Sequence, residues 1–317
     1  MTTNTTQAQG VNQQQKEYLW PALPYEAWKD TLETLHMETQ IVGKVALELV
    51  PFLNQWWEVA LSVTARGLET MLIPSPTGGA FQIGFDFIDH NLAICTSDGR
   101  VKELALMERT VADFYKDFMA ALQALSIQVK INTKPVEVGN GIPFEQDTTH
   151  RSYDPEYVNR WWRILVQTTR VLEQYRSYFR GKSSPILFFW GTFDLAEARY
   201  SGKRASPPQG ADRIMRFSAN EEGIECGFWP GSSRLQTPAF YSFTYPEPQG
   251  LKNASIKPSA AHYDNNLGEF ILRYDDVRQS NAPEQTLLDF FQSTYEVGAK
   301  LAHWNTQELE QQPPQIQ

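Results

Sequence analysis

The stretch SSPILFFWGTFDLAEARYSGKR (Ser183–Arg204) combines the most apolar run of the second half with a dense group of charges. Its apolar part, residues 185–193, leads without a break into Asp194 and the basic residues that follow. A continuous apolar run is typical of a buried strand, and polar residues after such a strand are typical of a loop at one end of a core. We therefore expect a strand over Ile186–Phe193 that leads into a charged loop at a pocket.

Short matches between the two halves of the chain indicate an internal repeat. GLETMLIP (Gly67–Pro74) and GIECGFWP (Gly223–Pro230) share their Gly, a branched aliphatic residue, Glu and a closing Pro. Three further matches follow the same order: Gly43-Lys44 with Gly181-Lys182, Ala80-Phe81 with Ala239-Phe240, and Thr110–Tyr115 with Thr286–Phe291. Matches in one order favour duplication followed by insertion. The alternative is coincidence among common strand and helix sequences.

The predicted fold is α+β, with two tandem copies of a helix, antiparallel-sheet and helix unit packed as an internal pseudo-dimer. The copies cover residues 17–150 and 151–306, between disordered tails at 1–16 and 307–317. The expected helices are Tyr25–Met37, Met107–Leu125, Asp154–Phe179 and Leu287–Trp304. The expected strands are Val45–Val50, Trp57–Thr64, Leu68–Ile73, Ala80–Phe87, Leu92–Thr96, Ile186–Phe193, Arg213–Ala219, Ile224–Trp229, Ala239–Tyr245 and Glu269–Tyr274. Arg66-Gly67 and Glu222-Gly223 are the expected hairpin turns.

The second copy is longer than the first, and the extra residues are expected in a loop insertion near residues 191–209. Long loops on a rigid scaffold are where binding and catalytic residues concentrate. The alternative is a solvated turn with surface ion pairs.

Composition excludes several classes of partner. The net charge of −9 argues against nucleic acid, because non-specific binding needs a cationic surface. No run is apolar and long enough to span a membrane, and the first residues lack the apolar core of a signal peptide. Cys95 and Cys226 have no metal-type spacing, which favours a reducing compartment. We therefore expect a cytoplasmic protein without a nucleic-acid or membrane partner.

Several aromatic-rich segments carry a family resemblance. They are LHMETQIVGK (Leu35–Lys44), PFLNQWW (Pro51–Trp57), FDFIDH (Phe85–His90), DTTHRSYD (Asp147–Asp154), ECGFWPG (Glu225–Gly231), AFYSFTYPEP (Ala239–Pro248) and the opening stretch. From Tyr18 to Trp304 the chain resembles an uncharacterised bacterial domain-of-unknown-function family, DUF5996. It departs from the family pattern at Asn54-Gln55, where a His is expected, and at Tyr200 and Lys203. The resemblance implies no known activity.

Three residues are candidates for proton transfer: Asp194, His90 and His36. Histidine suits this role because its ordinary pKa lies near neutrality. An ion pair of Asp194 with Arg199 or Arg204 would stand at the mouth of the pocket. The alternative is that this pair only holds the loop to the edge of the sheet.

No metal or cofactor is predicted. His90, Asp86 and Asp89 could supply ligands, but strand alternation would place the two carboxylates on opposite faces. The sequence contains no paired-histidine or paired-cysteine metal motif, no P-loop and no dinucleotide-binding glycine motif.

The candidate ligand-binding residues are of two kinds. Basic side chains would hold a carboxylate or phosphate, and aromatic side chains would form the wall of a pocket. The basic group is Arg199, Lys203 and Arg204, and the aromatic group is Trp190, Trp229 and Tyr241. Core packing is the alternative role for the aromatic residues.

These features predict a small-molecule ligand and leave the class of function open. The first hypothesis is a cofactor-independent enzyme that performs acid–base chemistry on a small anionic, partly apolar metabolite. The alternatives are a non-catalytic small-molecule-binding protein and a protein-interaction module that uses the same pocket. The sequence predicts no oligomeric state.

Overall fold

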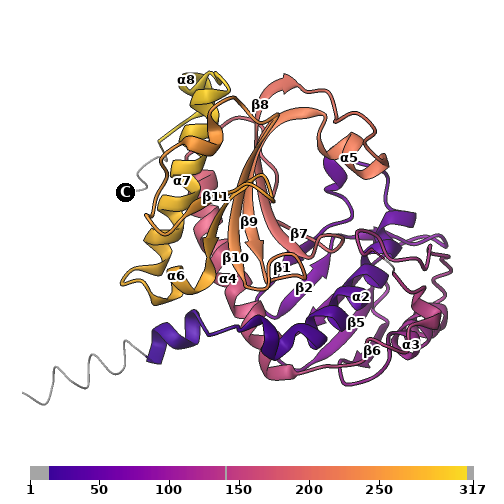
Figure 1. Cartoon of the computed structure of the whole chain (residues 1–317). Helices are drawn as coiled ribbons and strands as arrows, with labels where there is room; N and C mark the ends of the chain where they lie inside the picture. The colour runs from indigo at the N-terminus through magenta and orange to yellow at the C-terminus, as the bar shows by residue number, and fades with distance from the viewer. Residues whose placement is uncertain (1–13, 140, 313–317) are drawn as a thin grey trace, which may run out of the picture.

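The computed structural model describes residues 14–139 and 141–312 and shows an α+β fold (Figure 1), which confirms the predicted class. Its helices pack against a twelve-stranded sheet in which every strand pair is antiparallel. The longer helices are α2 (Tyr25–Leu49), α3 (Val111–Ala124), α4 (Pro155–Ser177) and α7 (Pro283–Leu301). The shorter ones are α5 (Arg213–Ser218), α6 (Tyr274–Gln279) and α8 (Thr306–Leu309), with 3-10 turns η1 (Asn54–Trp56), η2 (Phe144–Gln146) and η3 (Leu251–Asn253).

One sheet runs through both halves of the chain. Its order is β11-β12-β10-β9-β8-β7-β1-β2-β4-β5-β6, with β3 paired to β4. The halves meet where β1 pairs with β7, at Leu61 and Phe188. The first-half strands are β1 (Leu61–Val63), β2 (Gly67–Thr70), β3 (Ile73–Pro74), β4 (Ala80–Asp86), β5 (Asn91–Thr96) and β6 (Val101–Ala105). The second-half strands are β7 (Leu187–Phe189), β8 (Asp194–Arg204), β9 (Glu221–Trp229), β10 (Ala239–Tyr245), β11 (His262–Asp264) and β12 (Glu269–Arg273).

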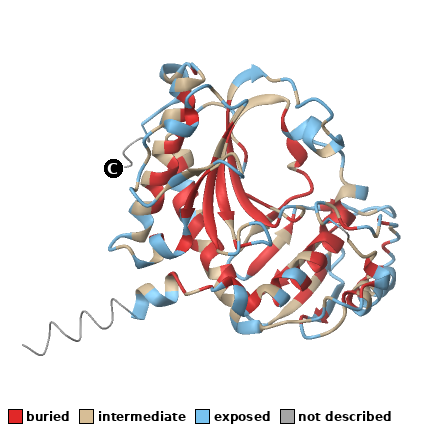
Figure 2. Ribbon diagram, viewed as in Figure 1, coloured by how far each residue is buried: buried red, intermediate tan, exposed pale blue. Residues whose placement is uncertain are grey.

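Helix α4 anchors the main hydrophobic core. Its Trp161 is fully buried and stacks on Phe193 with ring centroids 5.0 Å apart. Phe188 of β7 meets the same indole edge-on at 5.5 Å. Helices α4, α6 and α7 lie on one side of the second-half strands (Figure 1). The strands that they cover are largely buried (Figure 2).

Helix α3 begins at a capped residue. The Thr110 side chain accepts a hydrogen bond from the Asp113 amide at 3.1 Å, which satisfies one of the free N–H groups of the first turn. We expect Thr110→Ala to lower the free energy of unfolding by about 1 kcal/mol in urea denaturation. Thr77→Ala, in an exposed turn, is the control and should stay within about 0.5 kcal/mol of the wild type.

Helix α2 is longer than the sequence predicts, and the expected strand Val45–Val50 is wrong. Val45 and Ala46 continue the buried face of the helix, so the apolar run there is helical. Gly43 lies inside this helix because the Trp190 indole packs against its backbone. A β-carbon at Gly43 would lie 2.1 Å from the indole nitrogen.

The expected loop insertion near 191–209 is also wrong in its main part. Strand β8 begins at Asp194 and continues for 11 residues, and the preceding strand β7 is short. The expected strand Arg213–Ala219 is helix α5, and Glu222-Gly223 lies inside β9 rather than in a turn. Charged residues in β8 suggested solvent exposure, but this strand is buried on both faces over its first seven residues.

The predicted tails are described only in part. Residues 1–13 and 313–317 lie outside the described residues, and 14–19 are helical. Disorder from residue 307 is wrong where the structure describes the chain, because α8 ends in a bridge between Phe179 and Glu310. The Arg180 and Gln311 amides complete this attachment by donating to the carbonyls of Leu309 and Tyr178.

Among the described helices, none has an apolar stretch of the length that a bilayer crossing requires.

Candidate functional site

Strand β8 has two different faces. Leu195 belongs to a row that crosses the sheet through Phe228, Phe240 and Leu272, all buried in the main core. Because side chains alternate along a strand, Asp194, Ala196 and Ala198 point to the opposite face. A second, small apolar cluster lies on that face, formed by Ala239, Tyr241 and Ile271 with Trp229, Leu235, Phe243 and Leu267 beside them. We call this opposite side of β8–β12 the Tyr241 face.

Asp194 and Tyr241 form the centre of the Tyr241 face. The Tyr241 hydroxyl donates to one carboxylate oxygen of Asp194, and the Thr192 hydroxyl donates to the other. Both Asp194 and Tyr241 are buried. Gly227 makes this contact possible, because a β-carbon there would lie 2.8 Å from the Tyr241 hydroxyl and 1.9 Å from the Leu195 carbonyl.

Two further carboxyl groups lie around this pair. The Tyr241 hydroxyl is 3.4 Å from a Glu225 oxygen, so one phenol contacts two acidic side chains. Glu269 follows on β12, and its Oε2 atom is buried without a hydrogen-bond partner among the described residues. Trp229 stacks on the other side of Tyr241 with centroids 4.6 Å apart. The face therefore combines acidic groups with a half-buried aromatic surface.

Burial raises the pKa of all three carboxyl groups, to different extents. It raises the pKa of Asp194 to about 6, against the opposing effect of the bonds from Thr192 and Tyr241. Burial, and then the negative charge of Asp194, raises the pKa of Glu225 to about 8. The same two causes raise the pKa of Glu269 to about 8. Of the two groups that contact Tyr241, Glu225 therefore holds its proton more strongly than Asp194.

This arrangement provides a base and an acid side by side. Asp194 can accept a proton and Glu225 can donate one, and the Tyr241 hydroxyl connects them. The excess of carboxyl groups disfavours an anionic ligand on this face. The Trp229 ring would suit an apolar surface of a ligand.

The two candidate histidines lie elsewhere. The His36 ring, on α2, contacts the Gly191 carbonyl oxygen at 2.9 Å and the Gln40 amide at 3.0 Å, and burial lowers its pKa to about 4. It reaches the turn before Asp194 but not the carboxyl group itself. His90 bonds to the Tyr153 hydroxyl at 2.9 Å in the first half of the chain. The predicted cooperation of Asp194 with His90 is therefore not supported by their positions.

The basic residues do not meet Asp194 either. Arg199 lies on the helix-facing side of β8, fully buried, with its guanidinium carbon 3.3 Å from the Tyr175 ring centroid. Lys203 and Arg204 are exposed at the far end of the strand. An Asp194 ion pair with Arg199 or Arg204 is wrong, because alternation separates the first pair and strand length separates the second.

The three aromatic candidates divide between the two faces. Tyr241 and Trp229 lie together on the Tyr241 face. Trp190 is buried in the main core, where its indole N–H donates to the Val59 carbonyl at 2.8 Å. Glu225 and Glu269 were missed by the sequence analysis. Alternation along β9 could have revealed Glu225, since it stands two residues from Gly227 on the same face.

The two carboxylates that were weighed as metal ligands are engaged with a basic side chain. Asp86 and Asp89 both contact Arg66 at 2.5 Å, so they converge on one cation rather than on opposite faces. Within residues 14–139 and 141–312, no group of three or more His, Cys, Asp or Glu side chains has a geometry able to hold a metal ion.

Comparison with known proteins identifies the family of the chain but no individual relative. A model described as a family of unknown function (DUF5996) matches residues 20–311. No curated protein and no solved structure shows a significant match to the chain.

Proposed function

The chain belongs to the DUF5996 family, for which no function is known, and we propose its function from the geometry of the Tyr241 face. The protein performs acid–base chemistry on a small, uncharged or cationic, partly apolar molecule. The observation that carries this proposal is the phenol of Tyr241 between Asp194 and Glu225. Two carboxyls with separated pKa values are the arrangement that general acid–base catalysis needs at neutral pH.

The sequence favours an anionic metabolite because Arg199, Lys203 and Arg204 are expected to hold a carboxylate or phosphate. With Arg199 on the other side of β8, no described hydrogen bond or ion pair joins Asp194, Glu225 or Glu269 to a cation. A cationic or neutral ligand is therefore the better match, and it would rest against Trp229. The second candidate function is binding without catalysis, since buried carboxyls beside an aromatic ring also suit an amine ligand.

Metabolite profiling separates these functions. Purified protein is incubated with a small-molecule extract of the cells that produce it, and mass spectrometry follows which compounds are consumed or formed. We expect the wild type to convert at least one compound, and Asp194→Asn to lower the rate roughly 10²–10⁴-fold, the usual contribution of a general acid or base. Asp117→Asn, at an exposed carboxylate paired with Arg109 at 3.3 Å, is the matched control.

Ultrafiltration of the same mixtures tests binding. A compound that is retained by the wild type and released by Asp194→Asn, but not converted, would establish the binding function instead. If the wild type, Asp194→Asn and Asp117→Asn convert and retain every compound to the same extent, the Tyr241 face has neither the catalytic nor the binding function.

We also propose that the two halves arose by duplication. The repeated Gly-aliphatic-Glu sequences begin at Gly67 in β2 and at Gly223 in β9, and the repeated Ala-Phe pairs lie in β4 and β10. In each half these two strands are antiparallel neighbours. Superposition of β2, β4 and β5 on β9, β10 and β12 in an experimental structure tests this origin, which fails if the repeated residues do not coincide.

A cytoplasmic location is part of the same proposal. The two cysteines are not joined, since Cys95 is exposed and Cys226 is buried. Free thiols suit a reducing compartment. Fractionation of the producing cells would show the protein outside the cytoplasm if this location is incorrect.

A further inference from the structure

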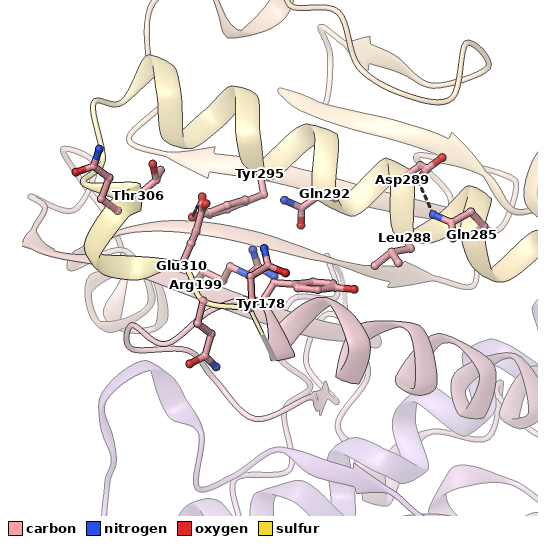
Figure 3. Close-up of a pocket in the computed structure, with 12 residues that line it drawn as sticks. Tyr178, Arg199, Gln285, Leu288, Asp289, Gln292, Tyr295, Thr306 and Glu310 are labelled. Carbon is pink, nitrogen blue, oxygen red and sulfur yellow. Dashed lines mark hydrogen bonds between the residues drawn. The ribbon is translucent and has the colours of Figure 1, made fainter. Parts of the chain in front are cut away.

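A separate pocket lies on the helix-facing side of β8. It has a volume of about 550 Å³ and is bounded by α7, the end of α4 and the segment 306–312, which we call the C-terminal strap (Figure 3). Tyr178, Arg199, Gln292, Tyr295 and Glu310 are among its lining residues. This volume lies within the range of small-molecule sites.

Arg199 borders this pocket with unused hydrogen-bonding capacity. One terminal nitrogen, Nη2, donates to the Tyr175 carbonyl, and the guanidinium lies 4.4 Å from the Tyr295 ring centroid. The Nε and Nη1 atoms are buried and have no partner in the described part of the chain. Arginine remains charged in proteins, and a buried cation with unpaired N–H groups is costly. The Glu197 carboxyl on the same face of β8 offsets the charge of Arg199 without a hydrogen bond to it, so these N–H groups favour a further acceptor.

Whereas Arg199 has unpaired donors, Gln292 has an unpaired acceptor. Its amide nitrogen donates to Glu296 at 3.0 Å, and its oxygen is buried with no donor within residues 14–139 and 141–312. The same pocket thus holds unpaired donors on Arg199 and an unpaired acceptor on Gln292. A ligand that satisfies both must carry an acceptor and a donor.

The carboxylates of the pocket already have partners. Glu310 accepts from the Tyr295 hydroxyl at 3.1 Å, and Asp289 accepts from the Gln285 amide at 2.7 Å. Their negative charge disfavours a purely anionic ligand, and it favours one that also presents a hydroxyl or ammonium group. Figure 3 shows Arg199 and Tyr295 close to Glu310 of the strap.

From these contacts we propose that the strap pocket binds a small carboxylate that also carries a hydroxyl or amino group. The carboxylate accepts hydrogen bonds from Arg199, and the hydroxyl or amino group donates to Gln292. The site is independent of the Tyr241 face, because Arg199 and Asp194 lie on opposite faces of β8. The C-terminal strap forms one wall of this site.

Three ligands of equal chain length test this pairing: glutarate, 2-hydroxyglutarate and glutamate, which differ only in the group on carbon 2. Isothermal titration calorimetry of the full chain should show binding of 2-hydroxyglutarate or glutamate at least about tenfold tighter than of glutarate, because one hydrogen bond to a buried group is worth that factor. Equal affinity for all three, or no heat with any of them at millimolar concentration, would overturn the proposal.

Variants place the binding in the pocket. Arg199→Met should abolish it, and Arg170→Met, at an arginine paired with Glu284 on the surface, should leave it unchanged. Gln292→Met should remove the preference over glutarate while leaving glutarate binding in place. Since Arg199→Met can fail to fold, Glu310→Gln provides a second arm. Removal of this rim charge should tighten glutarate binding several-fold, and an unchanged affinity in Glu310→Gln would contradict the proposed position of the carboxylate.

Discussion

Trp161→Ala is expected to lower the free energy of unfolding by about 4 kcal/mol, in the range observed for large-to-small changes at fully buried aromatic residues. The Trp161 indole contacts the rings of Phe188 and Phe193, at the join of β7 and β8, with centroids at 5.5 and 5.0 Å. It also contacts Phe87 of the first half at 5.6 Å. The cavity would therefore open where the two halves of the sheet meet.

Trp161→Phe separates packing from polarity. The Trp161 indole N–H is buried and has no acceptor among the described residues, so a phenyl ring keeps most contacts and removes an unsatisfied donor. We expect a loss of less than about 2 kcal/mol in this variant, measured by urea denaturation beside Trp161→Ala. If Trp161→Phe and Trp161→Ala lowered the free energy of unfolding equally, the indole N–H rather than ring packing would stabilise the join.

Sequence patterns were most reliable where one face of an element is buried and the other exposed. Strand β4 alternates between buried and half-exposed residues along its length, and both β4 and helix α3 were predicted close to their observed bounds. Strand β6 was missed, because four of its five residues are exposed and its sequence has no apolar alternation. Amphipathicity is visible in a sequence only when the element lies at the surface of the core.

Strand β8 shows the opposite limit. Both of its faces are buried, so it carries polar groups inward in two directions, and its charges resemble those of a solvated loop. The prediction that Asp194 has a functional environment stays untested, but its observed partner is Tyr241 from β10, 47 residues later. Such a contact depends on sheet order, which sequence spacing does not reveal. Arg199 was predicted in a loop beside Asp194, but it lies buried on the opposite face of β8.

Three carboxyl groups of the Tyr241 face predict an unusual dependence of stability on pH. Asp194, Glu225 and Glu269 have folded-state pKa values of about 6, 8 and 8, all above their ordinary values. Between about pH 4 and pH 8 the folded chain therefore binds more protons than the unfolded chain, and stability falls as pH rises through this window. Neutral His36, with a pKa lowered to about 4, contributes stability that is lost as pH falls below its ordinary value of 6.5. We expect maximal stability at mildly acidic pH.

Glu225→Gln should remove part of that fall. Because Gln resembles the protonated carboxyl, we expect Glu225→Gln to change the free energy of unfolding little at pH 5 and to raise it by roughly 2 kcal/mol at pH 8. Each pKa unit corresponds to about 1.4 kcal/mol, and relaxation around a half-buried group reduces the full effect. Urea denaturation at half-unit pH steps from 5 to 8.5 measures the slope. Glu26→Gln, at an exposed carboxylate paired with Lys29, is the control and should keep the wild-type slope. A Glu225→Gln variant that is destabilised equally at pH 5 and pH 8 would show that Glu225 is an ionised, bonded carboxylate. The acid–base pair with Asp194 would then be excluded, because both groups would be bases at neutral pH.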